Sequence, residues 1–324
     1  MLKTSTEMVR FALNGPTMGT RWSALFFAPK GFDPMPVQVA LQAVVEEVDA
    51  QMSTWKPDSD LMRLNAAPVG ARVVVPDRLS DVLRLGLEIS RASGGAFDIG
   101  MGDAVAAWGF GPEAAEPERI RSAMTARRVP THQAFDIDTA TGLVHKKSPF
   151  TLDLNGIAKG YGVDQLAAKL AAHGIGDALV GIDGEMRALG LRPDGDAWTI
   201  AVEAPDPARR APHSILALQD AAVATSGDYR HRVEVQGRHL SHTMDPRRGA
   251  PLLASPVSVT VVARTCAEAD AWATALMVTG SLEGERLARK RNLSALFIER
   301  EGDHLRETKV GRLFEAPSCS ERAR

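Results

Sequence analysis

The chain has 324 residues, of which 44% are hydrophobic and 24% are charged, the balance of an ordinary globular enzyme. Lys and Arg number 38 against 40 Asp and Glu, so the formal net charge of −2 argues against a nucleic-acid partner and against recruitment to an anionic membrane. The two cysteines, Cys266 and Cys319, have no CxxC spacing partner, so no metal or redox centre built on cysteine is indicated.

The first residues, MLKTSTEMVRFALNGPTMGT, contain no uninterrupted apolar segment of signal-peptide length, and no later run approaches a transmembrane span. We therefore expect no transmembrane segment and a cytoplasmic location for the chain as given. A leader outside this sequence would instead make the protein periplasmic.

Apolar periodicity predicts helices and strands that mix without a strict βαβ repeat. Strands are predicted over residues 17–27, entered through a Met-Gly turn, and over 134–138, 143–145, 178–182, 198–203, 214–218, 257–262 and 295–299. Helices are predicted over residues 37–53, 80–93, 113–128, 267–277 and 282–291, and one more begins near residue 158 and continues through 165–173. This pattern favours an α+β fold with mixed or antiparallel sheets and packed helices. We expect one catalytic domain over residues 1–316, either compact or divided into two lobes, followed by a flexible tail over 317–324.

The stretch LDLNGIAKGYGVD places Asp153 before a glycine turn at Gly156 and Lys159 near the start of the following helix. The first N–H groups of a helix have no internal partner and attract anions such as phosphate. A carboxylate beside a phosphate is repulsive unless a cation lies between them, so the stretch suggests phosphate plus metal. A plain strand, turn and helix with an Asp near the helix start is the alternative.

Asp270 and Thr274 lie four residues apart in AEADAWATALMVTG, on one face of the predicted helix. Their oxygens lie one above the other and suit a hard cation. The alternative is an Asp that complements the helix dipole and a Thr that bonds back to the backbone.

Three further stretches have residue types suited to ligand binding. In SHTMDPRRGAP, His242 precedes a proline turn whose arginines, Arg247 and Arg248, suit phosphate oxygens, although a hairpin with a solvated basic tip explains them equally well. Trp55 lies between a helix end and a loop, where its ring either stacks on a planar ligand or fills the core. The other stretches are AFD at residues 96–98, inside a glycine-rich region, and ATSGDYRHR at 224–232.

Taken together and in order, seven stretches resemble the ApbE family of FAD:protein FMN transferases. They are TMGT, MSTWKPDSDLMRLN, GGAFDIGMGD with WGFGP, LDLNGIAKGYGVD, ATSGDYRH, SHTMDPRRGAP and ADAWATAL. The resemblance implies an ApbE-like fold with an FAD cleft between two lobes. It also implies a flavoprotein transferase that moves FMN from FAD to a Ser or Thr hydroxyl of an acceptor protein through a phosphoester bond and releases AMP. The implied metal is Mg²⁺, with Mn²⁺ or Ca²⁺ as alternatives.

The same resemblance implies roles for individual residues. The metal ligands would be the Gly156 carbonyl, Asp270 and Thr274. Contacts to the flavin nucleotide would come from Met18, Trp55, Ala96, Phe97, Asp98, Asp153, Lys159 and either Thr243 or Met244. Asp153 is also a candidate catalytic residue. His242 is the candidate general base, since a neutral imidazole has a suitable pKa near neutrality.

The sequence departs from the family pattern at two places, one inside these motifs and one in GIDGEMRALG at residues 181–190. Ala273 stands where some members have an acid before the metal Thr, so a water would replace that ligand. Asp183-Gly184 replaces a double glycine and either changes a turn or adds a carboxylate near the cavity. Two other functions stay open, a metal-dependent FAD pyrophosphatase that releases free FMN and AMP, and a non-catalytic flavin-binding module.

Overall fold

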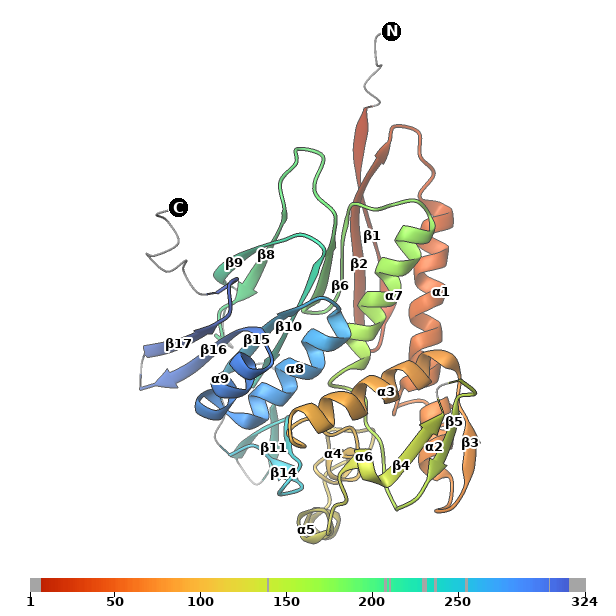
Figure 1. The fold of residues 1–324 in the computed structure, drawn as a ribbon, viewed down its shortest axis with the longest axis vertical. Helices are drawn as coiled ribbons and strands as arrows, with labels where there is room; N and C mark the ends of the chain where they lie inside the picture. Colours follow the sequence, from red (N-terminus) through yellow and green to blue (C-terminus); the bar gives the residue numbers. More distant parts are fainter. Residues whose placement is uncertain are drawn as a thin grey trace.

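A computed structural model describes residues 7–138, 140–206, 209, 211–228, 232–235, 238–253, 256–302 and 304–314. The fold is α+β, as predicted, and its centre is an eight-stranded sheet (Figure 1). The strand order is β1-β2-β6-β7-β10-β15-β16-β17, and every neighbouring pair is antiparallel. The strands are β1 Met8–Thr17, β2 Thr20–Pro29, β6 Ala178–Ile182, β7 Glu185–Leu189, β10 Ala221–Gly227, β15 Ser258–Ala263, β16 Ser294–Glu301 and β17 His304–Val310.

Helices cover one face of this sheet (Figure 1). They are α1 Met35–Met52, α7 Ala158–Ala172, α8 Cys266–Thr279 and α9 Ser281–Lys290. Successive side chains of a strand point to opposite faces, and β15 follows this rule. Val259 and Val261 are buried in the core that contains α8, whereas Val262 is buried in a separate core on the other face. The apolar alternation along the strands therefore produces two cores, one on each side of the sheet.

A two-stranded sheet covers part of the second face. It consists of β8 Trp198–Glu203 and β9 Pro212–Leu218, which pair antiparallel with a bulge next to Val202. The inward-facing residues of β8, Ile200 among them, pack against Val223 of β10 and Ile298 of β16. The molecule thus has three layers here, with helices, the large sheet and the β8–β9 pair in that order.

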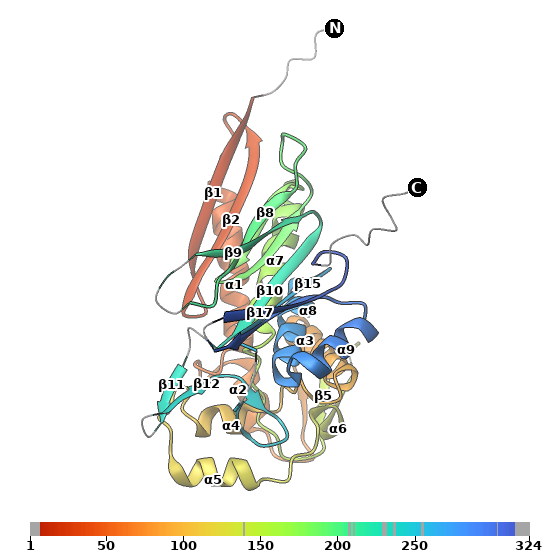
Figure 2. The ribbon, with the colours of Figure 1, turned by 90° about the vertical axis from the view of Figure 1, so that its left-hand side faces the viewer.

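The segment between α1 and α7 lies beyond one end of the large sheet in both views (Figures 1 and 2). Its elements are α2 Asp60–Ala66, β3 Arg72–Val74, α3 Asp77–Ala92, α4 Gly102–Ala107, α5 Pro117–Thr125, α6 Thr131–Ala134, β4 Phe135–Asp138 and β5 Leu143–Lys146. The central strand of its small sheet is β5. Two short antiparallel pairs, β11 Arg232–Val235 with β12 Arg238–Ser241 and β13 Met244–Asp245 with β14 Ala250–Pro251, lie near this end. Residues of this segment and of α8 share one buried core.

The strand predicted over 17–27, entered through a Met-Gly turn, is confirmed as β2. Met18 and Gly19 both have positive φ, 45° and 69°, and form a two-residue turn that joins β2 to β1. Of the strands in the large sheet, β1, β7, β10 and β17 were not predicted, and the helix predicted over 113–128 is limited to α5.

Some predictions have no test in these residues. Within the described part of the chain, every helix is too short or too polar to cross a lipid bilayer. The compartment therefore stays a prediction, as does the single domain over 1–316. Residues 229–231 of ATSGDYRHR and the predicted tail over 317–324 lie outside the described residues.

Candidate functional site

A cavity of about 1480 Å³ contains all the predicted site residues in its walls. They come from six separate stretches of the chain and are Met18, Trp55, Ala96, Phe97, Asp98, Asp153, Gly156, Lys159, His242, Thr243, Met244, Asp270 and Thr274. The cavity lies at the end of the pairing between β7 and β10. Strand β7 begins there at Glu185, and β10 continues beyond Val223, its last residue that pairs with β7. The sequence motifs therefore meet at one opening in the large sheet.

The three predicted metal ligands converge in this cavity. A side-chain Cβ built on Gly156 would lie 3.1 Å from Thr274 Oγ1, so the glycine turn is in direct contact with α8. Thr274 Oγ1 also lies 3.2 Å from Ser226 Oγ of β10. Asp270, one turn earlier on α8, is 5% exposed and lines the same space. The glycine turn at Gly156, the Thr274 hydroxyl and the Asp270 carboxylate therefore line the same part of the chain's cavity, with Ser226 of β10 beside them.

Asp270 also fixes the start of α7. Its Oδ2 accepts a hydrogen bond of 3.0 Å from the Gly160 N–H, one of the first N–H groups of α7 that lack a partner within their own helix. Burial and the neighbouring Glu185 raise the pKa of Asp270, against the opposing effect of Lys159. A bound cation would favour the ionised form of this carboxyl and so offset the cost of its burial.

Asp164 makes the reciprocal contact from α7 to α8. Its carboxylate accepts hydrogen bonds from the N–H groups of Cys266, at 2.9 Å, and Ala267, at 3.0 Å, which are the first two residues of α8. It also forms an ion pair of 2.6 Å with Arg187 of β7. The sequence reasoning missed Asp164 as part of this site, although it ends the LDLNGIAKGYGVD motif.

Lys159 lies between two carboxylates on the β6–β7 side of the cavity. Its Nζ lies 2.6 Å from Glu185 Oε1 and 3.7 Å from Asp183 Oδ2. Burial opposes its charge, but Glu185, Asp270 and Asp183 together raise its pKa above the ordinary value. Asp183 has a positive φ of 56°, a conformation that favours glycine, and the Asp-Gly departure adds a carboxylate near Lys159.

Glu185 is a cavity residue that the sequence reasoning missed, because DGE was interpreted only as a turn. Glu185 is 3% exposed, and its Oε2 atom has no hydrogen-bond partner among the described atoms. An unpartnered buried carboxylate oxygen is costly, so its presence at the wall indicates that the site accepts a cationic or hydrogen-donating group. The signal available in the sequence was an acid directly after the departure at Asp183.

Four of the predicted flavin contacts, Met18, Trp55, Ala96 and Phe97, line the cavity together with residues of α1 and the glycine-rich loop. Met18 is at the hairpin turn, and its methyl group approaches Gly162 of α7. Trp55 follows α1 and is 61% exposed, which excludes the core-filler alternative for this tryptophan. Phe97 is buried, and its ring edge would lie 3.2 Å from a Cβ at Gly156. An apolar wall with an exposed indole at its rim suits a planar aromatic ligand.

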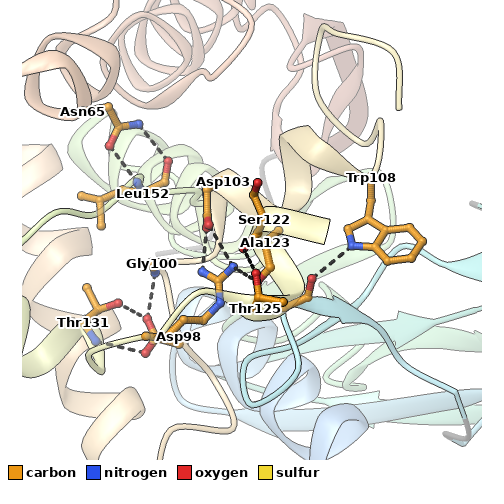
Figure 3. Close-up of polar contacts among 12 residues, drawn as sticks. Asn65, Asp98, Gly100, Asp103, Trp108, Ser122, Ala123, Thr125, Thr131 and Leu152 are labelled. Carbon is orange, nitrogen blue, oxygen red and sulfur yellow. Dashed lines mark hydrogen bonds and ion pairs between the residues drawn. The ribbon is translucent and has the colours of Figure 1, made fainter. Parts of the chain in front are cut away.

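Asp98 uses its carboxylate within the protein. The carboxylate accepts hydrogen bonds from Gly100 N at 2.8 Å, Thr131 N at 3.0 Å and the Thr131 hydroxyl, as Figure 3 shows. Nearby, the side-chain amide of Asn65 forms two hydrogen bonds with the backbone of Leu152, which fix the segment that leads to Asp153. The geometry therefore gives Asp98 a clear part in shaping the loop, and its contact with a ligand stays a prediction.

Asp153 is half-buried, and the enclosing protein raises the pKa of its carboxyl from 3.8 to about 6, although the Asn155 N–H donates to it at 2.9 Å. Its own N–H bonds Ile99 O at 2.8 Å, which ties it to the glycine-rich loop. The predicted acid therefore stands between the flavin end of the cavity and the glycine turn at Gly156.

His242, Thr243 and Met244 form the wall opposite the glycine turn. His242 is half-buried, and Thr243 and Met244 are 7% and 6% exposed, so the geometry does not separate the last two as ligand contacts. Arg247 and Arg248 are absent from the described cavity wall, and Arg248 donates to Pro251 O at 3.3 Å. The phosphate role suggested for this pair is not favoured, because the turn between β13 and β14 points them elsewhere.

The donor set suits a hard divalent ion. Mg²⁺ is usually bound through one or two carboxylates together with substrate phosphates and water, and dense carboxylate cages are not required. Among the described residues no cluster of three or more His, Cys, Asp or Glu side chains has metal-binding geometry. One carboxylate at Asp270, the Thr274 hydroxyl, the Gly156 carbonyl and the orphaned Glu185 oxygen nearby nevertheless match the small protein share of a magnesium site.

Comparisons with known proteins agree on one family. The model of the ApbE family matches residues 18–297. A relative from Vibrio cholerae named FAD:protein FMN transferase is 36% identical over 301 residues, covering 91% of this chain and 89% of its own. An Escherichia coli relative of the same name is 33% identical over 297 residues, covering 90% and 84%.

Solved structures give the same result. A Flavin Transferase ApbE from Vibrio cholerae superposes with a TM-score of 0.82 at 34% identity, covering 94% of this chain and 97% of that chain. The apo form of the Pseudomonas stutzeri flavinyl transferase ApbE gives a TM-score of 0.83 at 35% identity, with coverages of 96% and 98%. The match spans most of the sequence and nearly all of the fold, and this chain belongs to the ApbE family.

Proposed function

We propose that this ApbE-family enzyme transfers FMN from FAD to a Ser or Thr hydroxyl of an acceptor protein and releases AMP. The names of its relatives support flavin transfer from FAD to protein. The observation that carries the proposal is that Asp270, Thr274 and Gly156 share one cavity with the predicted flavin contacts Met18 and Trp55. That combination supports the proposal, because oxygens suited to a cation line the same cavity as side chains suited to a planar, phosphate-bearing ligand.

The reaction breaks the bond between the phosphorus of the FMN half and the oxygen that bridges it to AMP. A new phosphorus–oxygen bond forms to the acceptor hydroxyl, whose proton leaves, and AMP departs as the phosphate monoester. We assign the removal of that proton to His242, which lines the cavity. A phosphoryl transfer of this kind needs positioning and charge stabilisation and no covalent enzyme intermediate.

Asp270, Thr274 and the Gly156 carbonyl would hold the ion, for which Mg²⁺ is our proposal. When bound, it neutralises charge that develops on the phosphate oxygens during transfer. Lys159, fixed by Glu185 at 2.6 Å, adds a positive charge on the same side of the cavity. Met18, Trp55 and Phe97 orient the flavin, and this apolar end keeps water away from the ring system.

The test is a reaction of the purified protein with FAD, Mg²⁺ and a candidate acceptor protein, followed by mass spectrometry of the acceptor and chromatography of free nucleotides. The proposal expects an acceptor heavier by one FMN, an equal amount of AMP and no product in EDTA. Free FMN with unlabelled acceptor would support an FAD pyrophosphatase instead. FAD binding without AMP would support a non-catalytic flavin-binding module.

His242→Gln tests the assignment of the base. We expect transfer to fall by about 10²- to 10⁴-fold while FAD binding, measured by fluorescence titration, changes little. Unchanged transfer in this variant would remove the imidazole from the proposed reaction.

A further inference from the structure

One edge of β8 borders the cavity. Four consecutive residues, Ile200, Ala201, Val202 and Glu203, line it. Consecutive side chains of a strand point to opposite faces, so no single face of β8 contains all four residues. The cavity must therefore run along an edge of the strand, which all four residues share. Within the described part of the chain β8 pairs with β9 alone, which leaves this edge without a strand partner.

The hydrogen-bond register of the β8–β9 pair defines which backbone groups this edge presents. Ala204 N donates to Ala211 O at 2.8 Å just beyond the strand ends, and hydrogen-bonded pairs alternate along an antiparallel ladder. The bulge adds its extra residue to β9, so the alternation along β8 is kept. The N–H and C=O of Ala201 therefore point away from β9, on the side that borders the cavity.

The cavity connects the two faces of the large sheet. Asp270 and Thr274 reach it from α8 on the helical face. Ile200 and Val202 reach it from β8, and both belong to the core on the opposite face. The passage runs past Thr225 and Ser226 of β10, beyond the last residue that pairs with β7. A group that enters along β8 would thus arrive at the metal-binding oxygens from the side opposite the helices.

The size of the cavity leaves room for more than one ligand. Its volume of about 1480 Å³ exceeds the roughly 300–1,000 Å³ that holds a typical small ligand. Transfer of a phosphoryl group also requires the attacking oxygen to approach in line with the leaving oxygen. A donor dinucleotide on the helical side would leave the β8 side for the acceptor.

We propose that the free edge of β8 binds the acceptor protein as an extended segment that adds one strand to the β8–β9 pair. This inference rests on the proposed function and identifies how the acceptor hydroxyl reaches the site. Main-chain hydrogen bonds to an exposed strand edge are an established mode of peptide recognition, and they require an extended backbone more than a particular sequence. At about 3.3 Å per residue, the stretch Ile200–Glu203 would hold three or four acceptor residues.

The occupant is a peptide because of the chemistry of the edge. Ala201 is exposed and contributes only a methyl group, so the backbone is its main means of recognition. Alternating N–H and C=O groups match another extended backbone over several residues, whereas an adenine ring or a ribose pairs with at most one or two of them. The Ser or Thr of the added strand would then face the oxygens at Thr274 and Asp270.

Ala201→Pro tests the inference, with Ala217→Pro as its matched control. Proline removes the N–H and places its ring at the edge, and strands tolerate it where the N–H has no ladder partner. Ala217 is an exposed alanine of β9, paired in register with Thr199, and the same alternation turns its backbone to the outer edge away from the cavity. The probe is a pool of synthetic 12-residue peptides, each with one central Thr, from which mass spectrometry selects the best FMN acceptor.

We expect Ala201→Pro to raise the KM for the selected peptide about tenfold, the effect of losing one or two net hydrogen bonds. Ala217→Pro should leave it within twofold, and both variants should bind FAD with the parent affinity in a fluorescence titration. Parent-like FAD binding also shows that each variant is folded. A second readout uses the selected peptide N-methylated at alternate positions, where one register should abolish labelling and the other should preserve it.

Each contrary result overturns the inference. An equal rise in the KM for FAD would place the β8 edge in the donor site. Equal effects of Ala201→Pro and Ala217→Pro, or insensitivity to N-methylation, would exclude strand addition. Labelling of an intact acceptor protein without labelling of any peptide would also contradict it, whereas absence of labelling of every acceptor, protein or peptide, would contradict the proposed function.

Discussion

Asp164 of α7 and Asp270 of α8 each bind the N-terminus of the other's helix. Asp164 accepts the N–H groups of Cys266 and Ala267, and Asp270 accepts the N–H of Gly160. Carboxylates complement the positive end of a helix, so the two helices stabilise each other's first turns. These contacts fix the position of α7, which contains Lys159, relative to α8, which contains the proposed metal ligands Asp270 and Thr274.

Asp164→Ala should lower the free energy of unfolding by about 2–4 kcal/mol, because it leaves Arg187 and two helix N–H groups without their partner. Chemical denaturation measures the change. The comparison is Thr265→Ala, which removes the side-chain cap of α8, the helix whose first N–H groups Asp164 accepts. It should lower the free energy of unfolding by about 1 kcal/mol. A smaller loss at Asp164 than at Thr265 would contradict the reciprocal capping.

Gly160→Ala should destabilise the protein by about 1–3 kcal/mol and reduce metal-dependent activity, since its Cβ would lie 2.4 Å from Cys266 O. The matched control is Gly176→Ala, where nothing lies within 4 Å of the added Cβ. The control should be neutral or slightly stabilising. Equal unfolding free energies for the two variants would show that α7 and α8 do not need this close approach.

Asp153→Asn should change the pH dependence of stability. The native pKa of Asp153 is about 6 against an ordinary 3.8, so between these values the folded chain binds more protons than the unfolded chain. Stability from this group is therefore present below about pH 4 and is lost as the pH rises to 6.

Asparagine does not titrate. The melting temperature of the variant minus that of the parent should therefore increase from pH 4 to 6.5 and be constant at higher pH. Thermal melts in EDTA without FAD measure it, with Asp58→Asn at an exposed position as control. A constant difference across this range would contradict the raised pKa.

Asp270→Ala should abolish turnover, with a loss of about 10²-fold or more, and leave appreciable FAD binding. AMP release and fluorescence titration separate the two effects. Glu283→Ala, at an exposed acid on α9, should keep both activities. Normal turnover in the Asp270 variant would remove the metal from the mechanism.

Lys159→Met should destabilise the protein, because Glu185 would keep a buried charge without its cation, at a cost of about 3–5 kcal/mol when a buried pair is broken. Adding Glu185→Gln to that variant should recover a large part of the loss. Denaturation of the parent, both single variants and the double variant forms a complete cycle. Additive losses would show that the two residues do not interact.

The resemblance of the ordered motifs to the ApbE family predicted which residues meet in the cavity, whereas each motif taken alone has an ordinary structural explanation. Helix α7 was predicted even though Gly160 and Gly162 disfavour helices, and the structure shows why Gly160 is there, since Cys266 of α8 approaches it closely. The fold class followed from element order alone.

Features that depend on tertiary pairing were missed. Strand β10 has the sequence AAVATSG, which is poor in strong strand formers, and its pairing with β15 and β7 holds it extended. Glu185 was interpreted as part of a turn, because only the fold brings it to Lys159 across 26 positions of sequence. The approach of β8 to the cavity likewise depends on packing between layers, which periodicity within one strand does not encode.

The break in the pairing of β7 with β10 has a consequence for the motions of this enzyme. Backbone amides at Thr225–Gly227 have a ladder partner on the β15 side only, whereas Ala222 and Val223 are held from both sides. Local opening of the sheet should therefore begin at the reaction site and spread outward, so that deuterium would enter this strand from its active-site end first.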